Sequence, residues 1–284
     1  MPGEWIEVVA KGPPASKGEA AALLIASGSP GVLETSKGRT QTLTAYFSGS
    51  SLRDIALLRK KAASIGWKLT TSPYTEEDWL VKWRRNLRPL RAGRVLVKPS
   101  WSGARRRRGE VVLEIDPGMA FGTGHHATTR LCLKALSAYL GPGGSGRVGG
   151  GNVLDVGTGS GILAIAAKKL GAKSAIGIDI DPEALKVARK NARLNNVKVS
   201  FSSKAVSEVR GRYRVVVANI LAGVLIGLAP DIVRKVGPGG ILILSGILKE
   251  EAGGVRDAYA ELGLCHVKTM RSREWSAVIL KREP

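Results

Sequence analysis

The chain contains few cysteines and histidines. There are 2 cysteines and 3 histidines among its 284 residues. Cys132 and Cys265 lie in apolar patterns, where a free cysteine acts as a small buried hydrophobic residue. Neither residue type recurs at the paired spacing of zinc ligands, so no metal site is expected. A disulfide has little support in a reducing compartment.

Long apolar runs and an export signal are also missing. No run of about eighteen apolar residues occurs, so no transmembrane helix and no membrane partner are expected. The N-terminal segment MPGEWIEVVAKGPP carries Glu4 and Glu7 and lacks the basic and then apolar pattern of a signal peptide. These absences predict a cytoplasmic protein.

Acidic residues are scarce relative to basic ones. The chain has 23 Asp and Glu against 44 Lys and Arg, a formal net charge of +21. Such a charge attracts nucleic acid or an RNA-containing assembly, at least non-specifically. A proteome shifted toward basic proteins by hot or salty growth conditions would produce the same imbalance. The charge alone therefore does not identify a substrate.

Residues 1–73 have the pattern of a small domain. Segments rich in β-branched and aromatic residues alternate with segments whose apolar residues recur at helical spacing. Strands are expected at 5–10, 32–36, 41–47 and 67–73, and helices at 18–28 and 51–66. This order of elements predicts a ferredoxin-like α+β domain.

Residues 74–115 are expected to link two domains. In the stretch TEEDWLVKWRRNLRPL (75–90), Trp79 and Trp83 lie on one face of an expected helix that Pro89 ends. This basic helix is a connector or a docking surface, or its tryptophans pack between the domains.

The same linking segment contains two expected strands, 94–101 and 110–116. They flank four consecutive arginines, Arg105–Arg108. We expect this run to form the solvated tip of a hairpin, and a patch for an anionic partner is the alternative.

Residues 116–284 alternate between strands and helices. Short, continuous apolar runs are typical of buried parallel strands. They lie at 153–157, 175–180, 199–203, 215–220 and 241–246, and a final pair at 265–271 and 275–282 is expected to form a hairpin. One antiparallel strand at the end of a mainly parallel sheet is typical of the methyltransferase variant of the doubly wound fold. We predict an α/β, Rossmann-like class I S-adenosylmethionine-dependent methyltransferase domain.

A glycine-rich turn follows the first strand of this domain, in LDVGTGSGILA. Gly157, Gly159 and Gly161 permit a tight bend and a close ligand approach, and the next helix presents unpaired backbone N–H groups. Asp179, about twenty residues later, is placed to accept hydrogen bonds from both ribose hydroxyls of an adenosine ligand. Asp155 either meets the methionine ammonium group or caps the loop. The Gly-Thr-Gly-Ser-Gly spacing favours S-adenosylmethionine over a dinucleotide.

Asn219 ends the fourth expected strand, in VVVANILAG. Ligands of open α/β sheets bind outside the carboxyl ends of the strands. Its side-chain oxygen is therefore placed to accept from an incoming amine and to orient the nitrogen lone pair. Capping of the following helix is the alternative role.

The segment DPGMAFGTGHHATTRL (116–131) precedes the first strand of the sheet. Its glycines indicate hinges, Phe121 an apolar cover over the cofactor, and Thr129 a polar cofactor contact, so we expect a lid. His125 and His126 would point about 100° apart on a helix, which makes them poor joint metal ligands. A general base or a helix-start contact remains open for them.

Several of these motifs occur together in one order. EDWLVKWRRNLRPL, PSW, DPGMAFGTGHHATTRLCL, VLDVGTGSGILAIAAKKLGA, GIDIDPEAL and VVANILAGVL resemble the PrmA family, the methyltransferases that modify the eleventh protein of the large ribosomal subunit. The resemblance covers residues 76–284 by motif and the N-terminal part by size and pattern only. Ala127 departs from the proline or glutamate usual there, which should affect loop stiffness.

The resemblance implies an N-terminal substrate-recognition domain and methylation of lysine ε-amines and the N-terminal α-amine of that ribosomal protein. It implies cofactor contacts by Thr129, Gly157, Asp179 and Asn219, and a mobile loop near the cofactor. That loop consists of Phe121, Gly122, Thr123 and Gly124. Contacts to nearby ribosomal RNA and a monomeric state are further expectations.

Two other functions compete with protein methylation. Methylation of a base amine in RNA or DNA fits the charge, but the fourth strand lacks the Asn/Asp-Pro-Pro-aromatic motif that such enzymes often use. A non-catalytic ribosome-binding module conflicts with the intact glycine turn, Asp179 and Asn219.

Overall fold

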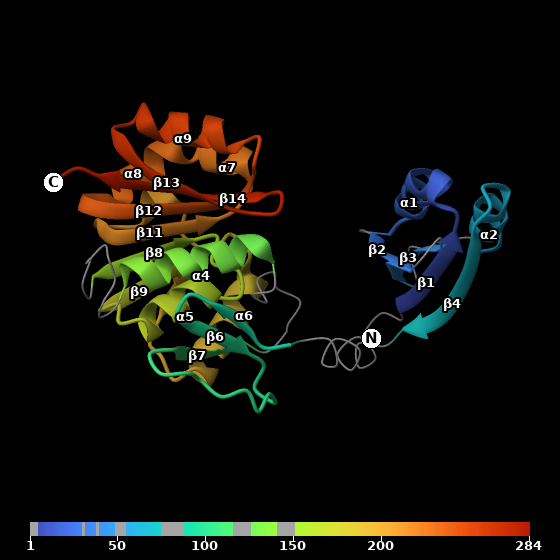
Figure 1. The fold of residues 1–284 in the computed structure, drawn as a ribbon, viewed down its shortest axis with the longest axis horizontal. Coiled ribbons are helices and arrows are strands. Elements are labelled where there is room, and N and C mark those ends of the chain that lie inside the picture. The colour runs from blue at the N-terminus through green and yellow to red at the C-terminus, as the bar shows by residue number, and fades with distance from the viewer. Residues whose placement is uncertain are drawn as a thin grey trace. The chain divides into compact units, whose positions relative to one another are not determined.

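The structure is a computed structural model that describes residues 5–29, 32–37, 40–48, 55–74, 88–115, 126–140 and 151–284. The chain divides into two compact units, Met1–Asn86 and Leu87–Pro284 (Figure 1). Several predictions lie outside the described residues: most of the tryptophan-bearing helix, His125, and the loop of Phe121, Gly122, Thr123 and Gly124.

The first unit contains a four-stranded antiparallel sheet in the order β2-β3-β1-β4. Its elements follow the expected strand–helix–strand–strand–helix–strand order, with a short 3-10 helix before the first α-helix. They are β1 (Trp5–Gly12), η1 (Pro14–Ser16), α1 (Lys17–Ala26), β2 (Val32–Lys37), β3 (Thr40–Ser48), α2 (Ile55–Ser64) and β4 (Lys68–Tyr74).

Trp67 is a centre of packing in this unit. Its side chain is buried, and its indole N–H donates to Ser16 Oγ at 2.9 Å. The ring lies so close to Gly12 that a Cβ there would be 2.4 Å from it. Alternate residues of β1, including Val8 and Ala10, are buried in the same core, because successive side chains of a strand point to opposite faces and only one face is covered.

The second unit is built on a seven-stranded sheet in the order β10-β9-β8-β11-β12-β14-β13. All neighbours are parallel except β14, which is antiparallel to both β12 and β13. Its strands are β8 (Asn152–Val156), β9 (Ser174–Ile178), β10 (Ser200–Ser202), β11 (Tyr213–Asn219), β12 (Val236–Leu248), β13 (Leu264–Ser272) and β14 (Trp275–Arg282). The five parallel strands and the final hairpin agree with the sequence prediction.

Helices cover both faces of this sheet (Figure 1). Alternate residues of β11 enter different cores: Val215 and Val217 face one, and Val216 and Ala218 face the other. The first core is shared with α4 (Ala127–Tyr139), α5 (Ile162–Lys169) and α6 (Pro182–Leu194), and the second with α7 (Ala222–Gly227), α8 (Ala229–Lys235) and α9 (Ala252–Ala260). Two helices, α7 and α8, follow Asn219, because Pro230 starts a new helix.

A three-stranded sheet packs on α4 and α5 within the second unit. It consists of β5 (Leu90–Ala92), which the sequence did not predict, β6 (Val95–Lys98) and β7 (Val111–Glu114). The expected hairpin around the arginine run is wrong, because β6 and β7 are parallel and β6 pairs antiparallel with β5 instead. Parallel strands need a long crossover, and residues 99–110 supply it.

The arginines of the run Arg105–Arg108 are exposed on this crossover. Glu110 anchors the crossover: its Oε1 lies 2.9 Å from Arg91 Nε, and its Oε2 accepts from the Arg107 amide at 2.7 Å. The hydrogen bond from Arg107 is the main cause of a lowered pKa at Glu110. Among the described helices, none is long and apolar enough to cross a membrane.

Candidate active site

The glycine turn between β8 and α5 has a backbone that favours glycine at three positions. Gly157, Gly159 and Gly161 have φ angles of 69°, 53° and 79°, all in the left-handed region. A Cβ on Gly157 would also lie 2.4 Å from Ile220 Cγ2. The structure therefore explains the glycines of this turn by backbone conformation and close approach.

Asp155 lies beneath the turn and is fully buried. Its Oδ2 accepts from Thr158 Oγ1 at 2.6 Å and from the Ala164 amide at 3.1 Å, so one oxygen caps the loop. Among the described residues, Oδ1 has no hydrogen-bond partner. Burial raises the pKa of Asp155 to about 7, although both hydrogen bonds oppose the shift.

Asp179 follows β9 and orders the turn from the neighbouring strand. Its Oδ2 accepts from the Gly159 amide at 2.8 Å, and its Oδ1 accepts from the Asp181 amide at 3.0 Å. Asp181 in turn caps α6 by accepting from the Glu183 amide at 2.9 Å. The partly exposed Asp179 carboxylate is thus held beside the glycine turn, where the sequence places a ribose contact.

Asn219 and Thr129, which are 90 residues apart, meet at the end of β11. Asn219 Nδ2 donates to Thr129 Oγ1 at 3.4 Å, and Thr129 is fully buried near the start of α4. The Oδ1 atom of Asn219 is buried and has no partner among the described residues. The threonine therefore holds the amide group while the amide oxygen keeps its acceptor capacity.

The two unpartnered oxygens lie on adjacent strands. Asp155 on β8 pairs in register with Val217 on β11, and Asn219 is two residues further along β11. Ser276 Oγ in β14 is the third buried atom without a partner in the described part of the chain. A buried acceptor without a donor is costly, so this edge of the sheet suits a ligand that brings N–H groups.

His126 faces other protein groups. Its Nδ1 is 2.8 Å from Thr128 Oγ1, and its ring packs edge-on against Trp275 with centroids 4.8 Å apart. The hydrogen bond is a contact within the start of α4, one of the roles left open by the sequence. Within the described ranges, no group of three or more His, Cys, Asp or Glu side chains is placed to hold a metal ion.

Gly246 is a structural part of the site that the sequence analysis missed. It has φ 85°, and a Cβ there would lie 2.3 Å from the Ile220 carbonyl oxygen. Gly246 thus lets the segment after Asn219 pass close to β12, where the Ile220 amide donates to Ser245 O at 3.1 Å. A glycine inside a buried strand run was the available signal, since such a glycine often marks a close backbone approach.

Comparisons with known proteins identify the family. A family model described as "Ribosomal protein L11 methyltransferase (PrmA)" matches residues 16–283. The chain belongs to this family. A Geobacter metallireducens protein of that name is 49% identical over 211 residues, which are 74% of this chain and 68% of the relative. One from Geobacter sulfurreducens is 44% identical over 255 residues, or 86% and 83% of the two chains.

Solved structures agree with this assignment. The ribosomal protein L11 methylase from Lactobacillus delbrueckii subsp. bulgaricus has a TM-score of 0.62 at 32% identity, covering 69% of this chain and 99% of that chain. A methyltransferase from Pyrococcus furiosus, at 19% identity, has a TM-score of 0.50 and covers 61% of this chain and 90% of that chain, which shows the fold alone. The protein is a class I methyltransferase, and S-adenosylmethionine is its cofactor.

The site fits this cofactor chemically. The methionine part of S-adenosylmethionine carries an ammonium group, a donor that the unpartnered Asp155 Oδ1 can accept from. The glycine turn has positive φ angles at Gly157, Gly159 and Gly161, and the helix that follows it begins with backbone N–H groups that can bind a polar ligand. Both features are properties of the residues themselves.

Proposed function

We propose that the protein transfers methyl groups from S-adenosylmethionine to amines of ribosomal protein L11, both lysine ε-amines and the N-terminal α-amine. Family membership supports the substrate, because the relatives are named for it. The observation that carries the chemistry is the buried Oδ1 of Asn219 at the end of β11, which has no hydrogen-bond partner among the described residues.

We further propose how the site residues divide the work. Gly157, Gly159 and Gly161 form the cradle of the cofactor, Asp155 meets its ammonium group, and Asp179 its ribose. Thr129 and the loop of Phe121, Gly122, Thr123 and Gly124 complete the cofactor site. Bound there, the cofactor supplies an electrophilic methyl group on a sulfonium.

Asn219 acts on the incoming amine. Its Oδ1 accepts an N–H from the neutral amine and so holds the nitrogen lone pair in line with the methyl group. Thr129 keeps the amide oriented through the 3.4 Å hydrogen bond. An α-amine with pKa near 8 is partly neutral at physiological pH, whereas a lysine with pKa near 10.4 must first lose a proton. Proton loss to solvent and desolvation of the amine are sufficient in this scheme, without a dedicated base.

We propose that residues 1–73 in the first unit recognise the protein substrate and that residues 116–284 carry catalysis. Residues 74–115 connect them, and their strands β5, β6 and β7 belong to the second unit. The high positive charge supports a contact with ribosomal RNA beside the substrate. We also propose that the enzyme acts as a monomer in the cytoplasm.

Transfer of a labelled methyl group tests the proposal. Purified L11, free ribosomal RNA and intact ribosomes are offered in parallel to the wild-type protein and to Asn219→Ala. We expect label in L11, in free form or within ribosomes, and strongly reduced label with the variant. Label found only in RNA would show that the substrate is a nucleic-acid base, and label in neither would contradict both assignments.

A further inference from the structure

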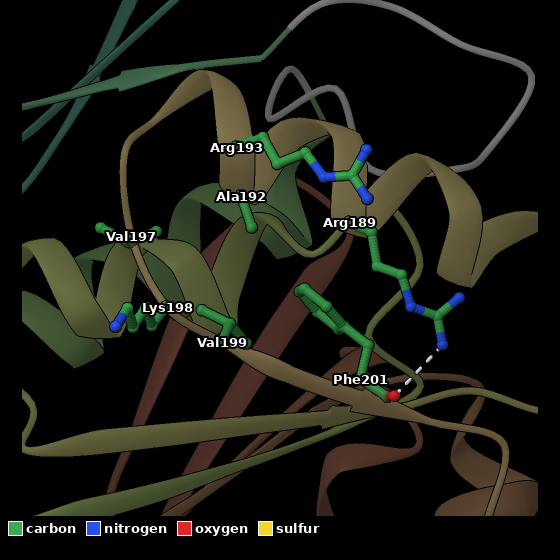
Figure 2. A pocket seen from close by; sticks show the side chains of 7 residues that line it. All are labelled: Arg189, Ala192, Arg193, Val197, Lys198, Val199 and Phe201. Carbon is green, nitrogen blue, oxygen red and sulfur yellow. Dashed lines mark hydrogen bonds between the residues drawn. The ribbon is translucent and has the colours of Figure 1, made fainter.

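A basic cleft lies at the edge of the seven-stranded sheet where β10 ends the order. It has a volume of about 230 Å³ and is formed by the last turns of α6 and the segment leading into β10. Its cations are Arg189, Arg193 and Lys198, and none of the described residues that line it is acidic. Figure 2 shows both arginines on one side of the Phe201 ring and Lys198 on the other.

The floor of the cleft is apolar. The Phe201 ring contributes to it together with three aliphatic side chains, Ala192, Val197 and Val199. Phe201 is fixed from below, since a Cβ on Gly177 would approach its ring to 2.8 Å. An aromatic ring held in place between cations is suited to stack a planar base while the cations hold phosphate.

The charge around the cleft is continuous and largely unopposed. Lys186, Arg189, Lys190 and Arg193 lie at i, i+3, i+4 and i+7 on α6, so they form one exposed stripe. From residue 184 to residue 207 the sequence contains no Asp or Glu.

Few of these cations are engaged within the protein. Arg189 Nη2 donates to the Phe201 carbonyl at 3.2 Å, which orients its guanidinium across the cleft. Lys186 pairs with Glu183 at 2.7 Å. In the described part of the chain, Arg193 and Lys198 have no carboxylate partner within 4 Å.

From these features we infer that the cleft binds one nucleotide of a single-stranded RNA segment, with the base on the apolar floor and the phosphates on the three cations. With a volume of about 230 Å³, the cleft has no room for more than one base. An acidic protein surface would satisfy the cations but would leave the solvent-facing part of the apolar floor, which packs on the core from its other side, uncovered.

The Phe201 ring at the floor of the cleft packs against the glycine turn, where a Cβ on Gly161 would lie 3.1 Å from it, but the cations of the cleft extend away from the site of methyl transfer. Arg193 lies eleven residues beyond Pro182, at the far end of α6 from the cap next to Asp179. At 1.5 Å per residue this separation is about 17 Å. The inference therefore does not depend on which amine accepts the methyl group.

The test compares two pairs of substitutions that remove the same charge. The double variant Arg193→Gln with Lys198→Gln removes two of the three cationic side chains of the cleft. The control, Arg271→Gln with Lys249→Gln, changes two exposed residues near β13, the opposite edge of the sheet. Binding is measured with a labelled oligoadenylate of about ten nucleotides over a range of salt concentrations. A polyglutamate peptide is the second probe.

We expect the cleft variant to bind oligoadenylate about tenfold more weakly than the wild type. The slope of log K against log salt should fall by about 1.4, because two phosphate contacts of a single strand are lost. The control should stay within about twofold of the wild type, with an unchanged slope. Thermal unfolding of both variants within a few degrees of the wild type shows that the fold is kept.

Equal weakening by the two variants would overturn the inference, because net charge alone would then explain binding. So would a cleft variant that loses polyglutamate binding to the same extent, since the partner would then be an acidic peptide. Methyl transfer to free L11 should be unchanged in the cleft variant. A failure of the RNA test is therefore distinct from a failure of the proposed methyl acceptor.

Discussion

Two regions of the second unit bury polar side chains in opposite ways. At the strand-end site, defined by Asp155, Asn219 and the glycine turn, two buried oxygens have no donor among the described residues. At the α6–β7 junction, defined by Asn191, Asn195 and Glu114, the buried side-chain amides form hydrogen bonds within the protein. Asn195 accepts from the Glu114 amide at 2.8 Å and donates to the Glu114 carbonyl at 2.5 Å.

The junction illustrates what a purely structural polar group does. Asn191 Nδ2 donates to Ser160 O at 2.9 Å, and Asn195 also donates to Asn191 O at 2.9 Å, so α6 is tied to both the glycine turn and β7. Burial of polar groups is tolerated when each finds a partner. The junction thus differs from the strand-end site, where our proposal assigns the acceptors without a described partner to ligands.

The largest effect is expected from a side chain in the glycine turn. Gly157→Ala adds a Cβ 2.4 Å from Ile220 Cγ2 at a φ of 69°, so Ile220 next to Asn219 must move. Displacements of about 1 Å at a reacting centre cost about a hundredfold, and the cofactor cradle is distorted as well. We expect kcat/KM to fall more than about a hundredfold. Gly211→Ala, at φ 88° in open space, is the control and should keep near-normal activity.

The second-largest effect is expected at Asn219, whose side-chain amide is proposed to contact the amine that accepts the methyl group. Asn219→Ala removes the oxygen that orients the amine, and kcat at saturating cofactor should fall about a hundredfold with little change in cofactor affinity. Thr129→Val should show a smaller loss in kcat, because the 3.4 Å hydrogen bond to the amide is lost while the amide oxygen stays, and loss of the proposed cofactor contact should also weaken cofactor binding. Near-normal turnover of Asn219→Ala would rule out the proposed role.

A pH-dependent effect is expected at Asp155. Because burial raises its pKa to about 7, the carboxyl group is protonated below that pH in the free protein. A cationic ammonium favours the ionised form, so affinity for S-adenosylhomocysteine should increase as the pH rises from about 5.5 to 7.5. Asp155→Asn should bind about tenfold more weakly at pH 7.5 and should lose this pH dependence. Isothermal titration of both proteins at several pH values measures the difference.

The same substitution, Asp155→Asn, is expected to raise the stability of the fold although it weakens ligand binding. A carboxyl whose pKa is raised on folding binds more protons in the native than in the unfolded state between about pH 4 and 7. The free energy of unfolding therefore falls as the pH rises through this window. Asp155→Asn removes the penalty, so its unfolding temperature should exceed that of the wild type at pH 8 and match it near pH 4. A variant less stable than the wild type at pH 8 would contradict this linkage.

The smallest effect on the site is expected at the junction. Asn195→Ala leaves the amide and carbonyl of Glu114 without their partners and should lower the free energy of unfolding by about 3 kcal/mol. Cofactor affinity below the unfolding temperature should stay within about twofold of the wild type. Thermal unfolding and titration with S-adenosylhomocysteine check the two parts. A large loss of affinity in the folded variant would remove the distinction between the two regions.

Much of the architecture could be predicted from local patterns. The continuous apolar runs, the glycine turn and the strand positions are visible in short windows, because buried strands and positive φ angles each impose local residue choices. Whether two neighbouring strands pair parallel or antiparallel is not visible in such short windows. β6 and β7 were expected to form a hairpin, but they are parallel neighbours, and β5 lies antiparallel on the other edge of β6. A short window of sequence cannot show in which direction a strand returns after a connection as long as residues 99–110.

The sequence by itself determined the alternating α/β pattern of the second unit, the family resemblance and the identity of Asp155, Asp179 and Asn219 as site candidates. Only the tertiary structure decided how these residues act together. In the folded chain, one carboxylate oxygen of Asp155 caps the loop and the other has no partner among the described residues. The Thr129 hydroxyl lies within hydrogen-bond distance of the Asn219 amide. The tertiary structure also made Gly246 necessary beside Ile220. The physical reason is that residue type sets what a group can donate or accept, whereas long-range packing sets which partners reach it and which of its atoms stay available.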